Sequence, residues 1–285
     1  MAFGPILTAM VTPFDADGAV DEEATVRLLH HLADNGSDGA VVAATTGEAS
    51  VLSDEEHVGL VRLAVEQAPA GFTVLAGAGS NDTRHACALT ERCTEAGAQG
   101  ILSVTPYYVR PSRKGILAHF GEVARATDRP VLLYNIPSRT ATDMPNDLLA
   151  ELAQIDGIEG VKQARYENLA RIDGLDLYAG NDDLLAQVLD LGGPGGILVA
   201  SHLVGREMRR MVDAPDRRHE IEDGLRDLYA ALFVTSNPTP LKAALNLIGL
   251  DVGGHRLPLV DADEDELAVI RGALERHGLL ERARA

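Results

Sequence analysis

Lys162 is the residue whose type and position are best suited to covalent chemistry. It ends an apolar run that begins at Gly157, and it is one of only three lysines, with Lys114 and Lys242, among 25 basic residues. An arginine would serve any purely electrostatic purpose here. A lysine amine can lose its proton and attack a carbonyl, which a guanidinium does not do. Lys162 is therefore a candidate nucleophile, and a lysine snorkelling or salt-bridged at the protein surface is the structural alternative.

Three further groups carry side chains that complement an amine. Tyr134 ends another apolar run, where a phenol transfers protons or caps a core. Thr45 and Thr46 begin a Thr-Thr-Gly-Glu turn that suits a carboxylate, although ordinary turns use the same residues. The guanidinium of Arg139 can form paired hydrogen bonds with a carboxylate. The alternative is that Arg139 is an ordinary surface arginine. Together these residues predict a site for Schiff-base chemistry on an acid substrate.

The elements that must position these residues are short apolar runs alternating with amphipathic helical segments. Apolar residues on both faces of the runs indicate buried parallel strands. Eight such units predict a (β/α)8 TIM barrel, whose catalytic groups gather where the strands end. A doubly wound sheet would usually show G-x-G-x-x-G after the first strand, but Thr12-Pro13-Phe14 stands there. The expected strands are residues 6–11, 39–44, 73–76, 100–104, 130–134, 157–161, 176–179 and 195–200.

The pattern becomes helical after the eighth strand. Residues 204–234, 240–250 and 263–280 read as helices, which is more than a minimal barrel needs. We therefore expect a C-terminal helical appendage. Residues 1–203 would hold the strands and most helices, and 204–285 the last barrel helix and the C-terminal helices, packed as one unit with the barrel.

Composition excludes several classes of function. The net charge of −18 argues against nucleic acid and anionic membrane surfaces as partners. The chain has no apolar run of about 18 residues and no signal-peptide pattern, which predicts a cytoplasmic protein. Cys87 and Cys93 are six residues apart, so we expect two buried or half-buried thiols. The histidines lack metal-binding motifs, so we expect no metal.

Ordered motifs over nearly the whole chain resemble the dihydrodipicolinate synthase family of the N-acetylneuraminate lyase superfamily. The motifs are Thr-Thr-Gly-Glu at 45–48, Val-Thr-Pro-Tyr-Tyr at 104–108, Tyr-Asn-Ile-Pro-Ser-Arg-Thr at 134–140, Gly-Val-Lys at 160–162, Ala-Gly-Asn-Asp at 179–182 and Asn-Pro-Thr-Pro-Leu-Lys at 237–242. The resemblance implies the same barrel, no metal or organic cofactor, and a homotetramer built from dimers.

The resemblance also implies four catalytic roles. Lys162 would form the Schiff base with pyruvate, and Tyr134 would assist imine formation and proton transfer. Thr45 would link Tyr134 to Tyr108. Tyr108 would be lent across a tight dimer interface and complete the proton relay of the partner's site.

Four further residues would bind substrates. Thr46 would contact the carboxylate of pyruvate, and Arg139 would receive the carboxylate of aspartate 4-semialdehyde. Gly180 and Ile197 would form the wall that packs the bound pyruvate. Gln163 departs from the acidic residue that relatives often carry, without removing a catalytic group.

The resemblance also bears on feedback by lysine. In lysine-sensitive relatives an acidic side chain after the position of Asn81 pairs with the amine of the effector. His85 stands at that position here. We therefore expect weak or absent inhibition by lysine.

Three functions remain open on the sequence. The leading one is condensation of pyruvate with aspartate 4-semialdehyde in lysine and diaminopimelate biosynthesis, because Arg139 and the threonine pair suit two carboxylates. The second is a sugar-acid aldolase that cleaves 2-keto-3-deoxygluconate, with the same Lys162 and Tyr134. The third is a non-catalytic ligand-binding barrel, which would not need a nucleophilic amine.

Overall fold

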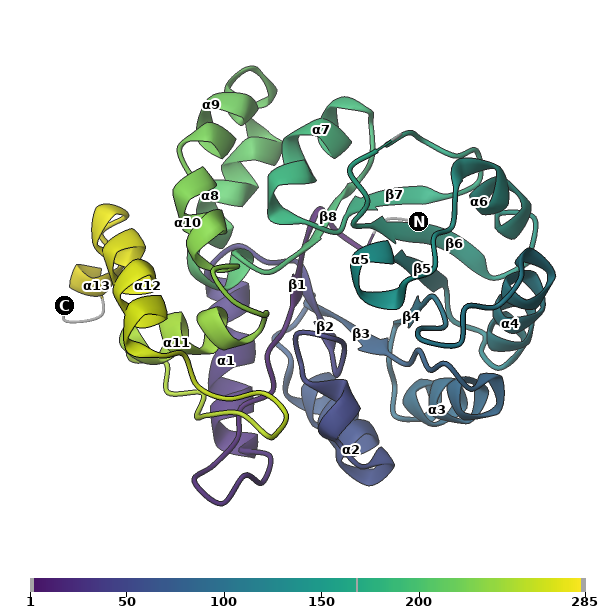
Figure 1. Cartoon of the computed structure of the whole chain (residues 1–285), viewed down its shortest axis with the longest axis horizontal. Helices are drawn as coiled ribbons and strands as arrows, with labels where there is room; N and C mark the ends of the chain where they lie inside the picture. The colour runs from purple at the N-terminus through teal and green to yellow at the C-terminus, as the bar shows by residue number, and fades with distance from the viewer. Residues whose placement is uncertain (1–2, 168, 283–285) are drawn as a thin grey trace.

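Eight parallel strands close into a barrel in sequence order, from β1 round to β8, and β8 pairs with β1 (Figure 1). The computed structural model describes residues 3–167 and 169–282. The predicted (β/α)8 barrel is thereby confirmed. The strands are β1 Ile6–Ala9, β2 Gly39–Val42, β3 Thr73–Gly77, β4 Gly100–Val104, β5 Val131–Asn135, β6 Ile158–Gln163, β7 Asp176–Ala179 and β8 Gly195–Leu198.

Helices surround the barrel, and several begin at the caps that the sequence offers. Ser53 forms a capping box with Glu56 at the start of α2, and the Asp82 carboxylate caps α3. The helices are α1 Glu22–Asp34, α2 Asp54–Gln67, α3 Thr83–Glu95, α4 Arg113–Arg125, α5 Pro137–Thr140, α6 Asn146–Leu152, α7 Leu185–Asp190, α8 Ser201–Asp213, α9 Arg218–Asp223, α10 Arg226–Ala231, α11 Thr239–Leu247, α12 Glu264–Arg276 and α13 Leu279–Arg282.

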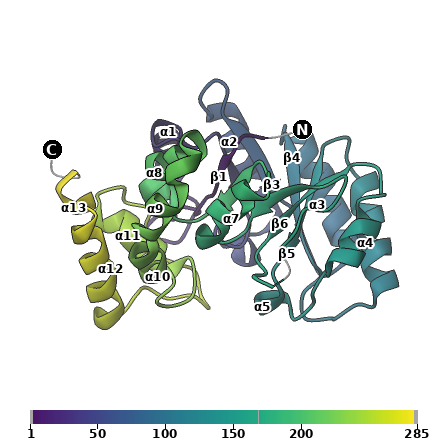
Figure 2. The same cartoon turned by 90° about the horizontal axis from the view of Figure 1, so that it is seen from above.

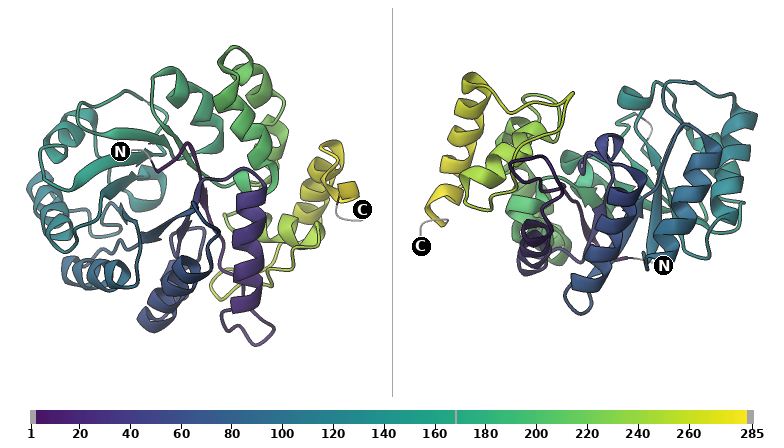
Figure 3. Two further views of the ribbon diagram at one scale, coloured as in Figure 1. Left: turned by 180° about the vertical axis from the view of Figure 1, so that it is seen from behind. Right: turned by 90° about the horizontal axis from the view of Figure 1, so that it is seen from below.

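The helices after α8 form the part of the chain that a minimal barrel lacks. Helix α12 packs on α10 and α11. Figures 2 and 3 show these yellow and light-green helices on one side of the barrel, away from α4. The division at residues 203 and 204 stays a prediction, and residues 283–285 lie outside the described part of the chain. No helix among the described residues is long and apolar enough to cross a bilayer.

Two strand ends differ from the prediction in a way that matters for the site. Strand β8 stops at Leu198 rather than at residue 200, because the N–H groups of Val199 and Ala200 donate to the Asp182 carboxylate. Strand β6 runs on to Gln163, which pairs with Asn135 of β5. Lys162 is therefore inside a strand rather than beyond it.

The barrel interior is a separate apolar cluster, distinct from the larger one between sheet and helices. It places inward-facing side chains of successive strands in layers, as in other closed eight-stranded barrels. Its members include Tyr134 of β5 and Ile197 of β8. The buried residues of this cluster are Phe3, Leu7, Ala9, Val41, Leu75, Leu102, Leu132, Tyr134, Ile136, Ala164, Tyr178 and Ile197. The two thiols are as expected, since Cys93 is buried and Cys87 is partly buried.

Candidate active site

Lys162 and Tyr134 lie side by side near the carboxyl ends of their strands. They are register partners between β6 and β5, and the Nζ atom of Lys162 lies 4.4 Å from the centre of the Tyr134 ring. The side chains are almost wholly enclosed, with exposed fractions of 4% and 5%. Lys162 forms no ion pair with any residue in the described ranges. The structure therefore supports a buried amine beside a phenol, and not a surface lysine.

Burial makes the Lys162 amine easier to deprotonate. Loss of hydration lowers its pKa to about 8, and the nearby Arg139 cation acts in the same direction. The Asp182 carboxylate opposes both, because an anion favours the charged amine. With a pKa near 8, about a tenth of the amine is unprotonated at pH 7. An ordinary exposed lysine would hold far less of the nucleophilic form.

Tyr134 is held in its protonated form by the same enclosure. Burial raises the pKa of its phenol to about 12, and Arg139 offsets part of this. A phenol that keeps its proton near neutral pH can donate a hydrogen bond to a developing oxygen anion and return the proton later. The pair thus supplies a nucleophile and a proton donor at one place.

Asp182 is a site residue that the sequence alone does not single out. Its carboxylate is buried, and Oδ1 accepts hydrogen bonds from Val199 and Ala200 at 2.9 and 3.0 Å. Burial raises its pKa to about 6 against these hydrogen bonds. An acidic residue three positions after the end of an apolar strand was the available signal, but a buried carboxylate is not predictable from that position alone.

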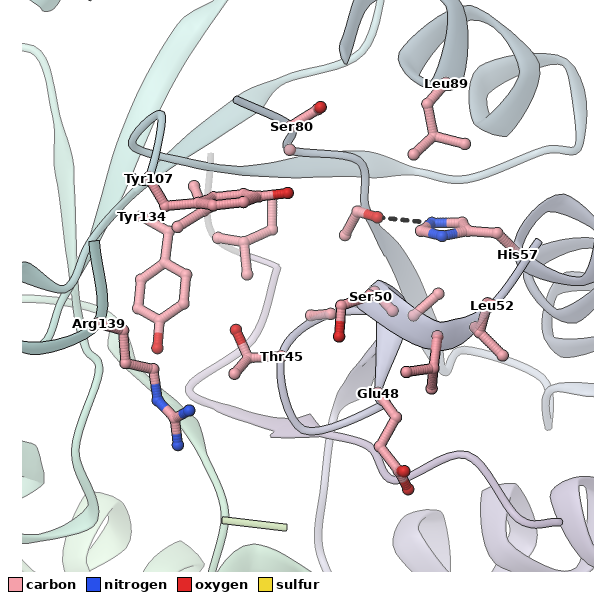
Figure 4. A pocket seen from close by; sticks show the side chains of 18 of the residues that line it. Thr45, Glu48, Ser50, Leu52, His57, Ser80, Leu89, Tyr107, Tyr134 and Arg139 are labelled. Carbon is pink, nitrogen blue, oxygen red and sulfur yellow. Dashed lines mark hydrogen bonds between the residues drawn. The ribbon is translucent and has the colours of Figure 1, made fainter. Parts of the chain in front are cut away.

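A cavity of about 470 Å³ is lined by Tyr134, while Lys162 lies against the Tyr134 ring and is not among the lining residues. Thr45, Tyr134 and Arg139 line one part of it, and His57 and His85 line another. In Figure 4 the hydroxyl of Tyr134 points toward Arg139, with Thr45 across the cavity. A small acid in this cavity would lie against Thr45, Tyr134 and Arg139.

The two predicted carboxylate-binding residues meet at Asn237, on the loop before α11. The Asn237 side-chain Nδ2 donates to Thr46 Oγ1 at 2.9 Å. Arg139 Nη2 donates to the main-chain oxygen of Asn237 at 3.2 Å. In the sequence Asn237 stands out only as part of the Asn-Pro-Thr-Pro-Leu-Lys motif. Its role was hidden because it lies 191 residues from Thr46 in the sequence.

Gly180 directly follows β7 and Ile197 lies on β8, the two strands after β6 in the barrel. The Gly180 N–H donates to Gln163 O at 2.7 Å, and a Cβ at position 180 would lie 2.7 Å from the Gln163 carbonyl carbon. Only glycine fits that approach. Ile197 is fully buried in the barrel interior. Their contact with a bound substrate stays a prediction.

Tyr108, a predicted catalytic residue, is exposed at the surface of its own chain and does not line the cavity. Its side chain is 86% exposed, whereas Thr45 is partly buried in the cavity wall. The neighbouring Tyr107 does line the cavity. A relay from Thr45 to the Tyr108 of the same chain is not formed, and the role of Tyr108 across an interface stays a prediction.

Fold and site together define a class: a (β/α)8-barrel enzyme that presents a buried lysine amine and a phenol to a carbonyl compound. The chain belongs to the dihydrodipicolinate synthetase family, a model of which matches residues 2–277. The resemblance seen in the sequence motifs is thereby confirmed.

Relatives match the chain over nearly its full length. It is 41% identical to the 4-hydroxy-tetrahydrodipicolinate synthase of Heliobacterium modesticaldum, over 98% of this chain and 97% of that protein. The dihydrodipicolinate synthase of Cyanidioschyzon merolae, solved with lysine bound, superposes with a TM-score of 0.93 at 40% identity, covering 98% of this chain and 99% of that one. The Acinetobacter baumannii enzyme, complexed with pyruvate, gives 0.93 at 33% identity, covering 98% and 100%.

Proposed function

We propose that this chain condenses pyruvate with L-aspartate 4-semialdehyde to 4-hydroxy-tetrahydrodipicolinate, through a Schiff base on Lys162. The observation that carries the proposal is the buried Lys162 amine, with its pKa lowered to about 8, lying 4.4 Å from the ring centre of Tyr134. Relatives about 40% identical that bear the name of this synthase support the choice of substrates.

The first half of the reaction attaches pyruvate. The unprotonated Lys162 amine attacks the C2 carbonyl, and Tyr134 donates a proton to the oxygen as it becomes a hydroxyl. Water leaves and an iminium forms. The iminium then withdraws electrons from the neighbouring methyl group, which loses a proton to give an enamine.

The second half joins the two substrates. The enamine carbon attacks the aldehyde carbon of the semialdehyde and forms a carbon–carbon bond, while the aldehyde oxygen takes up a proton. The amine of the semialdehyde then attacks the C2 iminium and displaces Lys162. The ring closes, the lysine is regenerated, and no metal or organic cofactor takes part.

The carboxylates of the two substrates are assigned to separate residues. Thr46 would receive the carboxylate of pyruvate, and Arg139 that of the semialdehyde. Gly180 and Ile197 would pack against the bound pyruvate. Arg139 is suited to this because its guanidinium forms paired hydrogen bonds with a carboxylate.

Turnover on competing substrates tests the proposal. The purified chain is given pyruvate with L-aspartate 4-semialdehyde, and in parallel 2-keto-3-deoxygluconate alone. Condensation with little cleavage of the sugar acid is the expected result, and efficient cleavage without condensation would replace the synthase by a sugar-acid aldolase. Borohydride with pyruvate should add mass to the Lys162 peptide, and an unmodified peptide would favour a non-catalytic barrel.

The pH dependence of imine formation follows from the Lys162 pKa. We expect the rate at low pyruvate to rise about tenfold per pH unit below pH 8 and to level off above it, because the free amine is the reacting form. The measurement is the initial rate of borohydride trapping from pH 6 to 10. A rise that continues unchanged to pH 10 would mean that the amine behaves as an ordinary exposed lysine.

We also propose a cytoplasmic homotetramer built as a dimer of dimers, in which Tyr108 completes the site of the partner subunit. The exposed aromatic side chain of Tyr108 supports this, since such a surface is typical of an interface.

Mixing of two inactive variants tests whether Tyr108 completes the site of the partner subunit. Tyr108→Phe and Lys162→Ala are each expected to be nearly inactive, but a dimer of one with the other holds one complete site. Refolding an equal mixture should restore up to about a quarter of the wild-type sites. If each site used its own Tyr108, the mixture would stay inactive.

Feedback by lysine is expected to be weak, because His85 replaces the acidic partner for the amine of the effector. The nearby Asp54 carboxylate does not replace the missing acidic partner, because its Oδ1 atom is already hydrogen-bonded to His85 Nε2 at 2.9 Å. His85→Glu should lower the inhibitory concentration of lysine by about tenfold or more, as a charge-assisted hydrogen bond is gained. His85→Gln is the neutral control. Strong inhibition of the unmodified chain would contradict the prediction.

A further inference from the structure

Asn237 touches both residues to which the substrate carboxylates are assigned. Its side chain is almost fully buried and donates to the Thr46 hydroxyl at 2.9 Å, while its main-chain oxygen accepts from Arg139 at 3.2 Å. Thr46 lies after β2 and Arg139 in α5, so Asn237 joins two loops of the barrel mouth to the start of α11.

The direction of the hydrogen bond to Thr46 decides what that hydroxyl can do. A threonine hydroxyl has one hydrogen and accepts through its lone pairs. Because the Asn237 amide donates, the hydrogen of Thr46 is left for an anionic oxygen of a substrate. If the side chain at 237 accepted instead, it would take that hydrogen, and Thr46 would present lone pairs to a carboxylate.

A second contact holds the same two segments together. Lys242, within α11, forms a fully buried ion pair at 2.7 Å with Glu48, two residues after Thr46. The ion pair between Lys242 and Glu48 thus holds the segments that carry Asn237 and Thr46 together, in addition to the hydrogen bond between those two residues.

We propose that Asn237 is a positioning residue for the condensation. Its amide orients the Thr46 hydroxyl as a donor to the carboxylate of pyruvate, and its main-chain oxygen holds Arg139 for the carboxylate of the aldehyde substrate. This inference rests on the proposed function for the identity of the second substrate. The pyruvate side of it rests only on the binding of an oxo acid at Lys162.

Two substitutions separate hydrogen-bond direction from packing. Asn237→Ala removes the donor, and the KM for pyruvate should rise about fivefold, the usual effect of one hydrogen bond. Asn237→Asp keeps the shape but takes the Thr46 hydrogen and adds a negative charge beside the carboxylate. Its KM for pyruvate should rise at least about tenfold, above that of the alanine variant. Retained trapping of Lys162 by borohydride at saturating pyruvate shows that each variant is folded and reactive.

If Asn237 served only packing, the isosteric Asn237→Asp variant would have a KM for pyruvate closer to that of the unmodified chain than Asn237→Ala. That order would overturn the proposal. The second arm uses a Thr46→Val background, in which Asn237→Ala should change the KM for pyruvate by less than about twofold. An undiminished effect there would show that Asn237 does not act through Thr46. Asn246→Ala, at an exposed asparagine that bonds Gly253 O and Val252 N, is the matched control and should leave the KM unchanged.

The pyruvate dependence of borohydride trapping keeps this test independent of the second substrate. If the unmodified chain fails to condense pyruvate with aspartate 4-semialdehyde, the proposed function is wrong. The order of the three pyruvate affinities then still decides the role of Asn237.

Discussion

Replacing Lys162 by alanine is expected to abolish the attachment of pyruvate and to lower kcat by at least about a thousandfold, because the covalent step has no substitute nucleophile. The buried amine of Lys162 makes the bond to C2 of the substrate in this mechanism. The measurements are the condensation rate and the mass of the protein after borohydride reduction with pyruvate. The substituted chain should show no added mass.

Lys162→Arg separates the charge of this residue from its nucleophilicity. The guanidinium keeps a cation in the site, but it stays protonated and does not form the imine. We expect the arginine variant to be as inactive as the alanine variant. Appreciable activity of Lys162→Arg would mean that the residue at position 162 binds the substrate through its positive charge. That result would contradict the Schiff-base mechanism.

Lys114 supplies the control for both substitutions. It is exposed on α4, and Lys114→Ala and Lys114→Arg are expected to leave the rate and the trapping unchanged. If borohydride trapping persisted in Lys162→Ala but disappeared in Lys114→Ala, the imine would have been assigned to the wrong lysine.

Periodicity was sufficient to predict the barrel, since eight apolar runs in one chain have few other ways to bury both faces. It was not sufficient to place strand ends. Lys162 falls inside β6 because Gln163 pairs with Asn135 of β5, a contact between residues 28 positions apart. An apolar run ends where its side chains change, whereas a strand ends where its backbone pairing stops.

The site shows the same division between local and distant information. Lys162 and Tyr134 were recognisable because each ends an apolar run and carries a reactive group. Asp182 and Asn237 were not, because an aspartate or an asparagine in a loop is ordinary. Their importance comes from neighbours far along the chain, Val199 and Thr46, and only the closed barrel brings those together.

The buried pair of Lys242 and Glu48 leads to the largest expected effect on stability. Both side chains are essentially inaccessible, with exposed fractions of 0% and 1%, and they meet at 2.7 Å. The Lys242 ammonium also donates to Gly254 O at 2.6 Å and lies 4.3 Å from the centre of the Phe14 ring. Removing Lys242 takes away the ion-pair partner of the buried Glu48 carboxylate, which keeps a hydrogen bond from the Arg256 N–H at 3.3 Å. Breaking such a buried pair costs roughly 3–5 kcal/mol.

Lys242→Met is therefore expected to lower the urea midpoint of unfolding strongly, whereas the double variant Lys242→Met with Glu48→Gln should recover much of the loss. The double variant leaves no uncompensated charge, and a buried pair replaced by uncharged groups is often nearly neutral in free energy. Arg217→Met is the matched control, because the ion pair of Arg217 with Glu220 is exposed on both sides. It should not shift the midpoint measurably.

The double variant also tests why the pair lies next to the site. Glu48 follows the Thr45-Thr46-Gly47 turn and adopts a left-handed backbone conformation, with φ 54°, that a non-glycine residue holds only when its surroundings enforce it. If the pair fixes this turn, the double variant will be stable and yet bind pyruvate more weakly than the unmodified chain. A double variant with unchanged affinity for pyruvate would show that the pair has a structural role alone. A Lys242→Met chain as stable as the unmodified one would show that the ion pair with Glu48 does not stabilise the fold.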